Sequence, residues 1–348
     1  MRFGFVVHPL TPFQRRLLGV PSYDPRLLLT GRSHRRPARR LARISVEDPA
    51  GRRVHGLLAA VPSLPDELLT DQEAGIAAVA EAVALCHADG AGVVGLGAVA
   101  AMIGGQGKAV AKLAPCPVST GNAFTALAAV ETIARIRRLD GRRHAIGLLG
   151  PPGPVANAIL TRLAGRGDAV EVVAESPPRP LQKLVDELNA THHGHIRFVA
   201  SPTLGPGHIL VAASSTGGRL PLSSLPAGSV IVDVAAPQDV LHDVPRRDDI
   251  LLLDGEYVRL PRPLIGHGWR RAYGWVTGQG RSIFACFAEP MLMALAEDTS
   301  LCSVGRTVPD ERLRALGNLA SRHGFWVDRL HEYGRPVSAS RLRRFLVP

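Results

Sequence analysis

Apolar residues change their spacing along the chain, and the changes divide it into three regions. In the first region, short apolar runs at residues 3–7, 41–47, 54–61 and 93–96 predict strands, with a turn at 48–51 joining two of them. Apolar positions recur at helical spacing through residues 65–88, and a second long helix is expected over 121–139. We therefore predict an N-terminal α/β substrate-binding domain over residues 1–139.

Beyond residue 139 the chain consists of short, almost wholly apolar runs. They cover residues 145–149, 169–174, 196–200, 208–213, 229–234 and 250–253, with helical stretches at 154–163 and 180–190. Such strands separated by helices are typical of a parallel sheet covered on both faces. The pattern predicts an α/β fold with a Rossmann-like domain over 140–268. Residues 269–348 read as a helical C-terminal segment, with helices at 283–296 and 309–323 before a basic tail.

Composition narrows the class of protein. Hydrophobic residues make up 46% and charged residues 20% of the 348 residues, and the four cysteines form no CxxC pair. These values are typical of an intracellular globular protein and give no reason to expect a structural metal. No apolar run reaches the ~18 residues that a membrane-spanning helix needs, so the expected location is the cytoplasm, without a membrane anchor.

The net charge of +11 comes almost entirely from arginine. Arginines cluster between residues 32 and 43 and again between 135 and 143, with no aromatic residues among them. A GC-rich genome alone would enrich arginine. If the clusters are functional, the lack of stacking residues favours an acidic protein partner over nucleic acid.

A glycine-rich turn joins the first strand and the first helix of the predicted Rossmann-like domain. Its sequence, Gly150-Pro-Pro-Gly153-Pro154-Val155, has the strand–turn–helix context that a dinucleotide fingerprint requires. Pro151 and Pro154 have no N–H, so the backbone donors expected to reach a pyrophosphate belong to Gly153, Val155 and the residue after it. A tight connection without ligand is the alternative.

Three further residues are expected near the same cofactor. Glu175 ends the second apolar run, where a carboxylate accepts hydrogen bonds from the adenine ribose and favours NADH. Arg179 lies close enough in sequence to bind a 2′-phosphate, which leaves NADPH open. Ser214, after the fourth run, completes the set of expected cofactor-binding residues.

Pro290 restricts the helix that contains Cys286. Proline is tolerated in a first turn and costs ~3 kcal/mol in a helix interior, so the predicted helix begins near Ala288 and leaves Cys286 just before it. A thiol at that place faces the positive end of the helix dipole, which favours the nucleophilic thiolate. A buried structural cysteine is the alternative from these residues alone.

The segment Phe284-Ala-Cys-Phe-Ala-Glu-Pro-Met-Leu resembles the cyanobacterial aldehyde-forming long-chain acyl-(acyl carrier protein) reductases. The likeness extends over nearly the whole chain, in the family's order: residues 3–8, 54–56 and 64–65, Thr120-Gly121-Asn122, the Gly150 turn, Gly317 and residues 322–325. The resemblance implies a cysteine, matched by Cys286, that takes an acyl group from a carrier-protein thioester. NADPH then delivers hydride and an aldehyde is released.

The resemblance also implies residue roles and partners. Thr120, Gly121, Asn122 and Glu289 are expected to bind the substrate, and the cofactor is expected to be NADPH, with NADH kept open. The partners are an acyl carrier protein or acyl-CoA and an aldehyde-consuming enzyme, with no nucleic acid. Two other functions remain open: a shikimate-dehydrogenase-like reductase of ketones or imines, and a carrier-protein-binding component without catalysis. His8, His55 and His323 lie in matched segments, either as proton donors or as packed residues.

Overall fold

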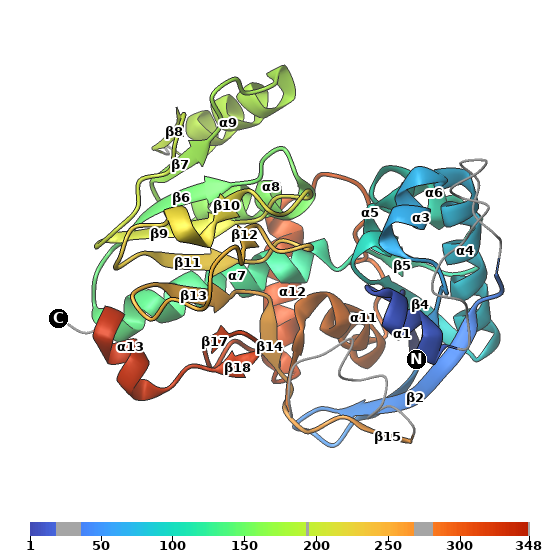
Figure 1. The fold of residues 1–348 in the computed structure, drawn as a ribbon. Coiled ribbons are helices and arrows are strands. Elements are labelled where there is room, and N and C mark those ends of the chain that lie inside the picture. Colours follow the sequence, from blue (N-terminus) through green and yellow to red (C-terminus); the bar gives the residue numbers. More distant parts are fainter. Residues whose placement is uncertain (19–35, 193–194, 268–280, 347–348) are drawn as a thin grey trace. The chain divides into compact units, whose positions relative to one another are not determined.

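The computed structural model describes residues 1–18, 36–192, 195–267 and 281–346. The chain forms two compact units, and each is assembled from separate stretches of sequence. Unit 1 comprises residues 1–122, 260–305 and 318–325, and unit 2 comprises residues 123–259, 306–317 and 326–348. Each unit contains one six-stranded sheet (Figure 1).

The sheet of unit 1 is mixed, with strand order β15-β2-β3-β1-β4-β5. Strands β1, β3, β4 and β5 are parallel, and β2 pairs antiparallel with β3 and β15. Their bounds are β1 Arg2–Val7, β2 Arg39–Glu47, β3 Arg53–Ala60, β4 Ala91–Leu96, β5 Val118–Ser119 and β15 Ile265–His267. The predicted strands are therefore present, and the sheet gains β15 from a distant part of the chain.

Two helices cover the two faces of this sheet because side chains alternate along each strand. On one face, α4 (Gln72–Ala88) packs against β1, where the Cβ of Cys86 would lie 2.6 Å from any Cβ placed on Gly4. On the other face, α11 (Ala285–Ala296) packs against β1 and β4, and the rings of Phe5 and Phe287 lie 4.7 Å apart. The glycine at position 4 thus lets α4 approach the sheet closely.

The helix predicted over 65–88 is divided in two. α3 (Pro65–Thr70) ends before Asp71, whose carboxylate accepts the Ala74 N–H at 3.1 Å and starts α4. Two short helices, α5 (Val99–Gln106) and α6 (Lys108–Leu113), follow β4 and were not predicted. Their apolar, glycine-rich sequence shows no helical periodicity, and Gly104 and Gly105 interrupt α5 with positive φ.

Unit 2 contains a wholly parallel sheet with strand order β13-β11-β9-β6-β7-β8. Numbered by position in the chain, this is the 3-2-1-4-5-6 order of the Rossmann fold. The bounds are β6 Ala145–Leu149, β7 Val170–Val173, β8 Ile196–Val199, β9 His208–Ala212, β11 Val230–Asp233 and β13 Leu251–Asp254. The α/β fold class and the predicted parallel sheet are confirmed, each strand within a residue or two.

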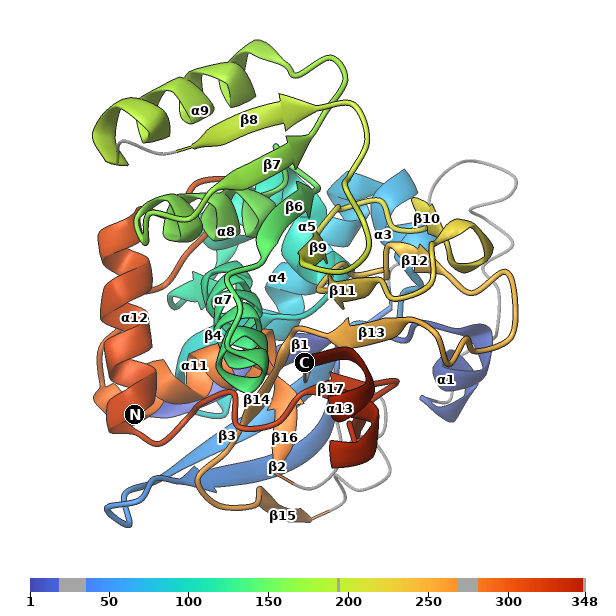
Figure 2. The same cartoon turned by 90° about the vertical axis from the view of Figure 1, so that its left-hand side faces the viewer.

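Helices join only the first strands of this sheet. α8 (Pro154–Ala164) connects β6 to β7, and α9 (Arg179–His192) connects β7 to β8, beside which it lies in both views (Figures 1 and 2). The later connections carry short pieces: β10 (Leu220–Pro221), a 3-10 turn at Leu222–Ser224, and β12 (Val240–Leu241). α7 (Asn122–Asp140) precedes β6. No described helix is both long and apolar enough to cross a membrane.

The compact units divide the chain differently from the expected boundaries at 139 and 268. The first division falls between residues 122 and 123, so that nearly all of α7 belongs to unit 2. The C-terminal residues are shared between the units and do not form a separate helical segment. Besides α11, they form α12 (Asp310–Arg322), α13 (Ala339–Leu346) and the strands β16 (Ser282–Phe284), β17 (His331–Glu332) and β18 (Arg335–Pro336). The short strand β14 (Tyr257–Arg259) lies at the end of the first stretch of unit 2, residues 123–259.

Candidate functional site

Cys286 is the second residue of α11, within its first turn. The helix begins at Ala285, three residues earlier than predicted, and Pro290 lies inside it. Because proline has no N–H, the helical hydrogen bond to the Cys286 carbonyl is missing. Pro290 is buried, and its Cγ would stand 2.7 Å from a Cβ on Gly95, so packing against β4 favours the proline at this position. The cysteine remains partly exposed at the positive end of the helix.

Gly121 lies directly against Cys286. Its φ is +74°, and a Cβ at this position would stand 2.4 Å from the Cβ and 2.5 Å from the Cα of Cys286. Only glycine combines this conformation with so close an approach. The structure thereby brings together the Thr120-Gly121-Asn122 segment and the cysteine, two features about 165 positions apart in the sequence.

The residues on either side of Gly121 have different roles. The backbone N–H and the hydroxyl of Thr120 both donate to the Ser303 carbonyl, at 2.9 and 3.1 Å, so Thr120 holds the loop in place. The side-chain nitrogen of Asn122 is buried and has no hydrogen-bond partner within the described part of the chain. A side-chain amide N–H is the type of donor that stabilises negative charge on a carbonyl oxygen.

Glu289 is completely buried, which differs from the expected contact with substrate. Its carboxylate accepts a hydrogen bond from the Ser119 hydroxyl, and the Ser119 oxygen accepts the Ser303 N–H at 2.9 Å. Glu289 follows Cys286 by three residues on α11, so this network connects the helix of the cysteine to the strand that leads into Gly121. Ser119 and Ser303 were not predicted, because nothing in their local sequence distinguishes them.

The three histidines of the matched segments lie in different surroundings. Burial lowers the pKa of His8 to about 4, and its Nε2 accepts the Val99 N–H at 3.1 Å at the start of α5. Its Nδ1 lies 3.1 Å from the Pro9 carbonyl, so the neutral ring donates there. His323 pairs with Asp48 at 2.9 Å, and His55 is exposed beside a separate cavity. His8 therefore has the packed, capping role rather than that of a proton donor.

In unit 2, the Gly150 turn occupies the point where the strand order reverses between β6 and β9. In Rossmann sheets, ligands bind outside the carboxyl ends of the strands at this point. Gly150 has a φ of +128°, and a Cβ there would stand 2.4 Å from the Ala213 carbonyl oxygen and 2.8 Å from the Ser214 nitrogen. The absence of a side chain allows the turn to lie against the segment that follows β9.

The turn offers fewer donors than the sequence suggested. The Gly153 N–H donates to the Gly150 carbonyl at 2.9 Å and closes the turn, while Pro151 and Pro154 have no N–H. Pro154 is the first residue of α8. The N–H groups of Val155 and Ala156, in the first turn of that helix, remain to bind an anion.

The other expected cofactor residues lie at or near the carboxyl ends of strands. Glu175 is exposed two residues after β7, and Arg179 is the exposed first residue of α9. Ser214, by contrast, is buried, and its N–H and hydroxyl both donate to Asp239, the N–H at 2.8 Å. Its polar groups are thus used within the loop rather than offered to a cofactor. Asp233, which ends β11 and was not predicted, accepts the N–H groups of Ala235 and Val240, both at 2.9 Å.

The two arginine clusters are partly used within the fold. Arg32 and Arg35 lie outside the described residues. Arg39 donates to the Leu18 carbonyl, and Arg43 pairs with Asp89 at 2.6 Å. These contacts give part of the first cluster a structural role.

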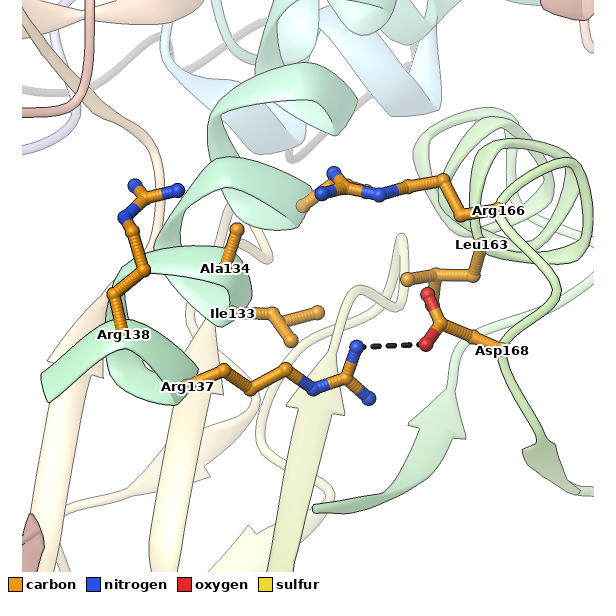
Figure 3. A pocket seen from close by; sticks show the side chains of 8 residues that line it. Ile133, Ala134, Arg137, Arg138, Leu163, Arg166 and Asp168 are labelled. Carbon is orange, nitrogen blue, oxygen red and sulfur yellow. Dashed lines mark hydrogen bonds and ion pairs between the residues drawn. The ribbon is translucent and has the colours of Figure 1, made fainter. Parts of the chain in front are cut away.

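In the second cluster, Arg137 pairs with Asp168 at 2.6 Å. Both residues line a small cavity of about 210 Å³, together with other residues of α7 and residues at and just after the end of α8 (Figure 3). Arg143 donates to the Gly167 carbonyl at 2.8 Å. This second cluster therefore also serves, in part, to hold the loop before β7.

Comparisons with known proteins include a curated relative and a distantly similar structure. No family model matches the chain. The chain is 27% identical over 358 residues to aminotransferase PigE of Serratia sp. (strain ATCC 39006), covering 98% of this chain and 41% of that protein. The chain thus spans less than half the length of this relative. D-Lactate dehydrogenase from Escherichia coli aligns with a TM-score of 0.26 and 12% identity over 73% of this chain and 89% of that one.

Proposed function

We propose that the protein reduces an acyl thioester to an aldehyde with NAD(P)H, through an acyl group carried on Cys286. The observation that carries the proposal is the contact between Gly121 and a partly exposed cysteine in the first turn of α11. The resemblance of the flanking segment to acyl-(acyl carrier protein) reductases supports the same chemistry.

The reaction has two stages at Cys286. The thiolate attacks the carbonyl carbon, a new C–S bond forms, and the bond to the carrier sulfur breaks, so that the carrier leaves as a thiol after taking up a proton. NAD(P)H held at the Gly150 turn would supply a hydride, and the thioester on Cys286 would then become a thiohemiacetal. The C–S bond then breaks, which releases the aldehyde and restores the cysteine. The Asn122 side-chain amide donates to the oxygen that carries negative charge in both stages.

The Gly150 turn is the proposed cofactor site. Its support is the 3-2-1-4-5-6 strand order, the close backbone approach at Gly150, and the N–H groups of Val155 and Ala156 at the start of α8. Glu175, exposed beyond the second strand of the sheet, would accept from the adenine ribose. The resemblance favours NADPH, and this carboxylate favours NADH.

The name of the PigE relative does not by itself assign aminotransferase activity to this chain, which spans 41% of that protein. Aminotransferases hold pyridoxal phosphate on a lysine. The chain has three lysines, and one of them, Lys183, is exposed and pairs with Glu187 at 3.6 Å. An aldehyde is a carbonyl compound of the kind that transamination consumes, so aldehyde formation is compatible with an aminotransferase as the partner that uses the product.

Intact-protein mass spectrometry after mixing with an acyl carrier-protein thioester tests the proposal. We expect an acyl adduct on the wild type that NADPH or NADH discharges with release of aldehyde, and no adduct on Cys286→Ser. Cys302→Ser is the matched control, because Cys302 is also partly exposed in unit 1, and it should retain the adduct. Turnover without adduct would favour a direct ketone or imine reductase, and binding without turnover would favour a carrier-binding component. Either result overturns the proposal.

A further inference from the structure

Unit 1 contains a cavity that lies away from Cys286, on the opposite face of its sheet. Its volume is about 510 Å³, within the range of small-molecule sites in proteins. It opens at the edge of the sheet, where β2 and β15 extend beside the end of α4. The lining residues are Arg2, Phe3, Arg43, Ile44, Ser45, His55, Gly56, Leu57, Cys86, Asp89, Ala91, Ile265 and Gly266.

The strand register shows that this cavity is on the α4 face. Leu57 pairs with Gly4 on β1, and both lie against Cys86 of α4. Phe5, one residue further along β1, points to the other face, where it contacts Phe287 of α11. An acyl group on Cys286 would have to pass through the sheet to enter the cavity, so the proposed reaction does not account for it.

The interior of the cavity is apolar. Leu57, Cys86 and Ala91 are buried and form its inner wall, and Ile265 of β15 is 48% exposed at its opening. Burial raises the pKa of the Cys86 thiol to about 12, so this group stays neutral at physiological pH and behaves as part of the apolar wall.

The opening of the cavity carries excess positive charge. Arg43 donates to the Asp89 carboxylate at 2.6 Å, Arg40 approaches the same carboxylate at 4.0 Å, and Arg2 donates to the Asp89 carbonyl at 2.8 Å. Of these arginines, Arg2 and Arg43 line the cavity, so two guanidinium groups and one carboxylate leave a net positive charge at the opening. His55 lines the same opening, and no hydrogen bond to it occurs within the described residues.

We infer that this cavity binds a small amphipathic anion: a phosphate or carboxylate head at Arg2 and Arg43, with an apolar body against Leu57, Ala91 and Ile265. The guanidinium groups of Arg2 and Arg43 supply charge-assisted hydrogen bonds for the head, and the wall buries a short apolar chain. This site is independent of Cys286. Arg43 belongs to the arginine cluster expected to bind an acidic partner, and this proposal gives it a small ligand as well.

Calorimetric titration of the 348-residue chain with octyl phosphate, octanoate and inorganic phosphate tests this inference. We expect octyl phosphate or octanoate to bind at low millimolar concentration or below, at least tenfold more tightly than inorganic phosphate. Binding of only one of the two chain-bearing probes identifies the head group that the site takes. Absence of binding by both, or inorganic phosphate binding as tightly as octyl phosphate, would overturn the inference.

Matched variants separate the cavity from general surface charge. Arg43→Ala should weaken binding at least tenfold, whereas Arg53→Ala should change it less than twofold, because Arg53 forms a similar two-nitrogen pair with Glu47 on the neighbouring strand but does not line the cavity. Ile265→Glu should abolish binding, and Leu113→Glu, at another exposed apolar residue of unit 1, should not. Equal losses within either pair would refute the site. Cys286→Ser protein should bind the same probes with unchanged affinity. A negative result for the cavity would therefore leave the proposed reaction at Cys286 untouched.

Discussion

Gly121→Ala tests the contact on which the candidate active site depends. The added Cβ would stand 2.4 Å from the Cβ of Cys286, where ordinary contact begins at 3.4 Å, so the two segments must separate by about 1 Å. The φ of +74° adds a cost of roughly 1–2 kcal/mol for a residue with a side chain. Forcing a methyl group into a packed position costs roughly 1–3 kcal/mol more.

Gly51→Ala isolates the backbone part of this effect. Gly51 has a φ of +84° in the same unit, and nothing lies within 4 Å of its Cβ position. Denaturant titration should therefore show a loss of roughly 1–2 kcal/mol in the free energy of unfolding for Gly51→Ala and roughly 2–5 kcal/mol for Gly121→Ala.

Acyl transfer to Cys286 should separate the two variants more sharply. A displacement of ~1 Å at a reacting group can reduce a rate about 100-fold, so we expect a loss of that order in Gly121→Ala under conditions where it is folded. Gly51→Ala should acylate at the wild-type rate. Similar stabilities and similar acylation rates in the two variants would show that Gly121 and Cys286 do not touch, and would refute the proposed geometry.

Four other substitutions have defined outcomes. Ser119→Ala leaves the buried Glu289 carboxylate without this donor and should reduce the free energy of unfolding by roughly 1–3 kcal/mol in denaturant titration; a neutral result would contradict the network. His8, with a pKa lowered from 6.5 to about 4, stays neutral in the folded state while the unfolded chain takes up a proton, so its contribution is complete above pH 6.5 and decreases as the pH falls toward 4, by about 3 kcal/mol in total. The stability difference between wild type and His8→Gln should shrink over that range, and a constant difference would refute the assignment. Glu175→Ser should raise the NADPH-to-NADH ratio of kcat/KM and Arg179→Ala should lower it; insensitivity to both would mean that neither side chain reaches the adenine ribose.

Local sequence was sufficient to predict the parallel sheet of unit 2. Its strands β6, β9, β11 and β13 are buried on both faces, so they appear as short, uninterrupted apolar runs, and the turns between strands contain glycine and proline. The Gly150 turn could be recognised for the same reason, since its spacing between strand and helix is a local property. The sequence did not show which N–H groups remain free to bind an anion. The Gly153 N–H is used by a hydrogen bond within the turn, and that bond is defined only by the folded structure.

Tertiary packing decided what the sequence left open at the candidate active site. In the sequence, Pro290 indicated a later helix start. In the structure, Pro290 packs against Gly95 of β4 and lies inside α11, so Cys286 falls in the first turn of the helix. We expected Glu289 to contact substrate, whereas in the structure it is buried and accepts a hydrogen bond from Ser119.

Contacts between distant segments have no local signature. The approach of Gly121 to Cys286, the β15 strand that completes the sheet of unit 1, and the division of the C-terminal residues between two units all join parts of the chain that are far apart in sequence. Periodicity reports which face of an element is buried but not what buries it. The residue types of the candidate site were therefore predictable from the sequence, whereas their arrangement depended on long-range packing.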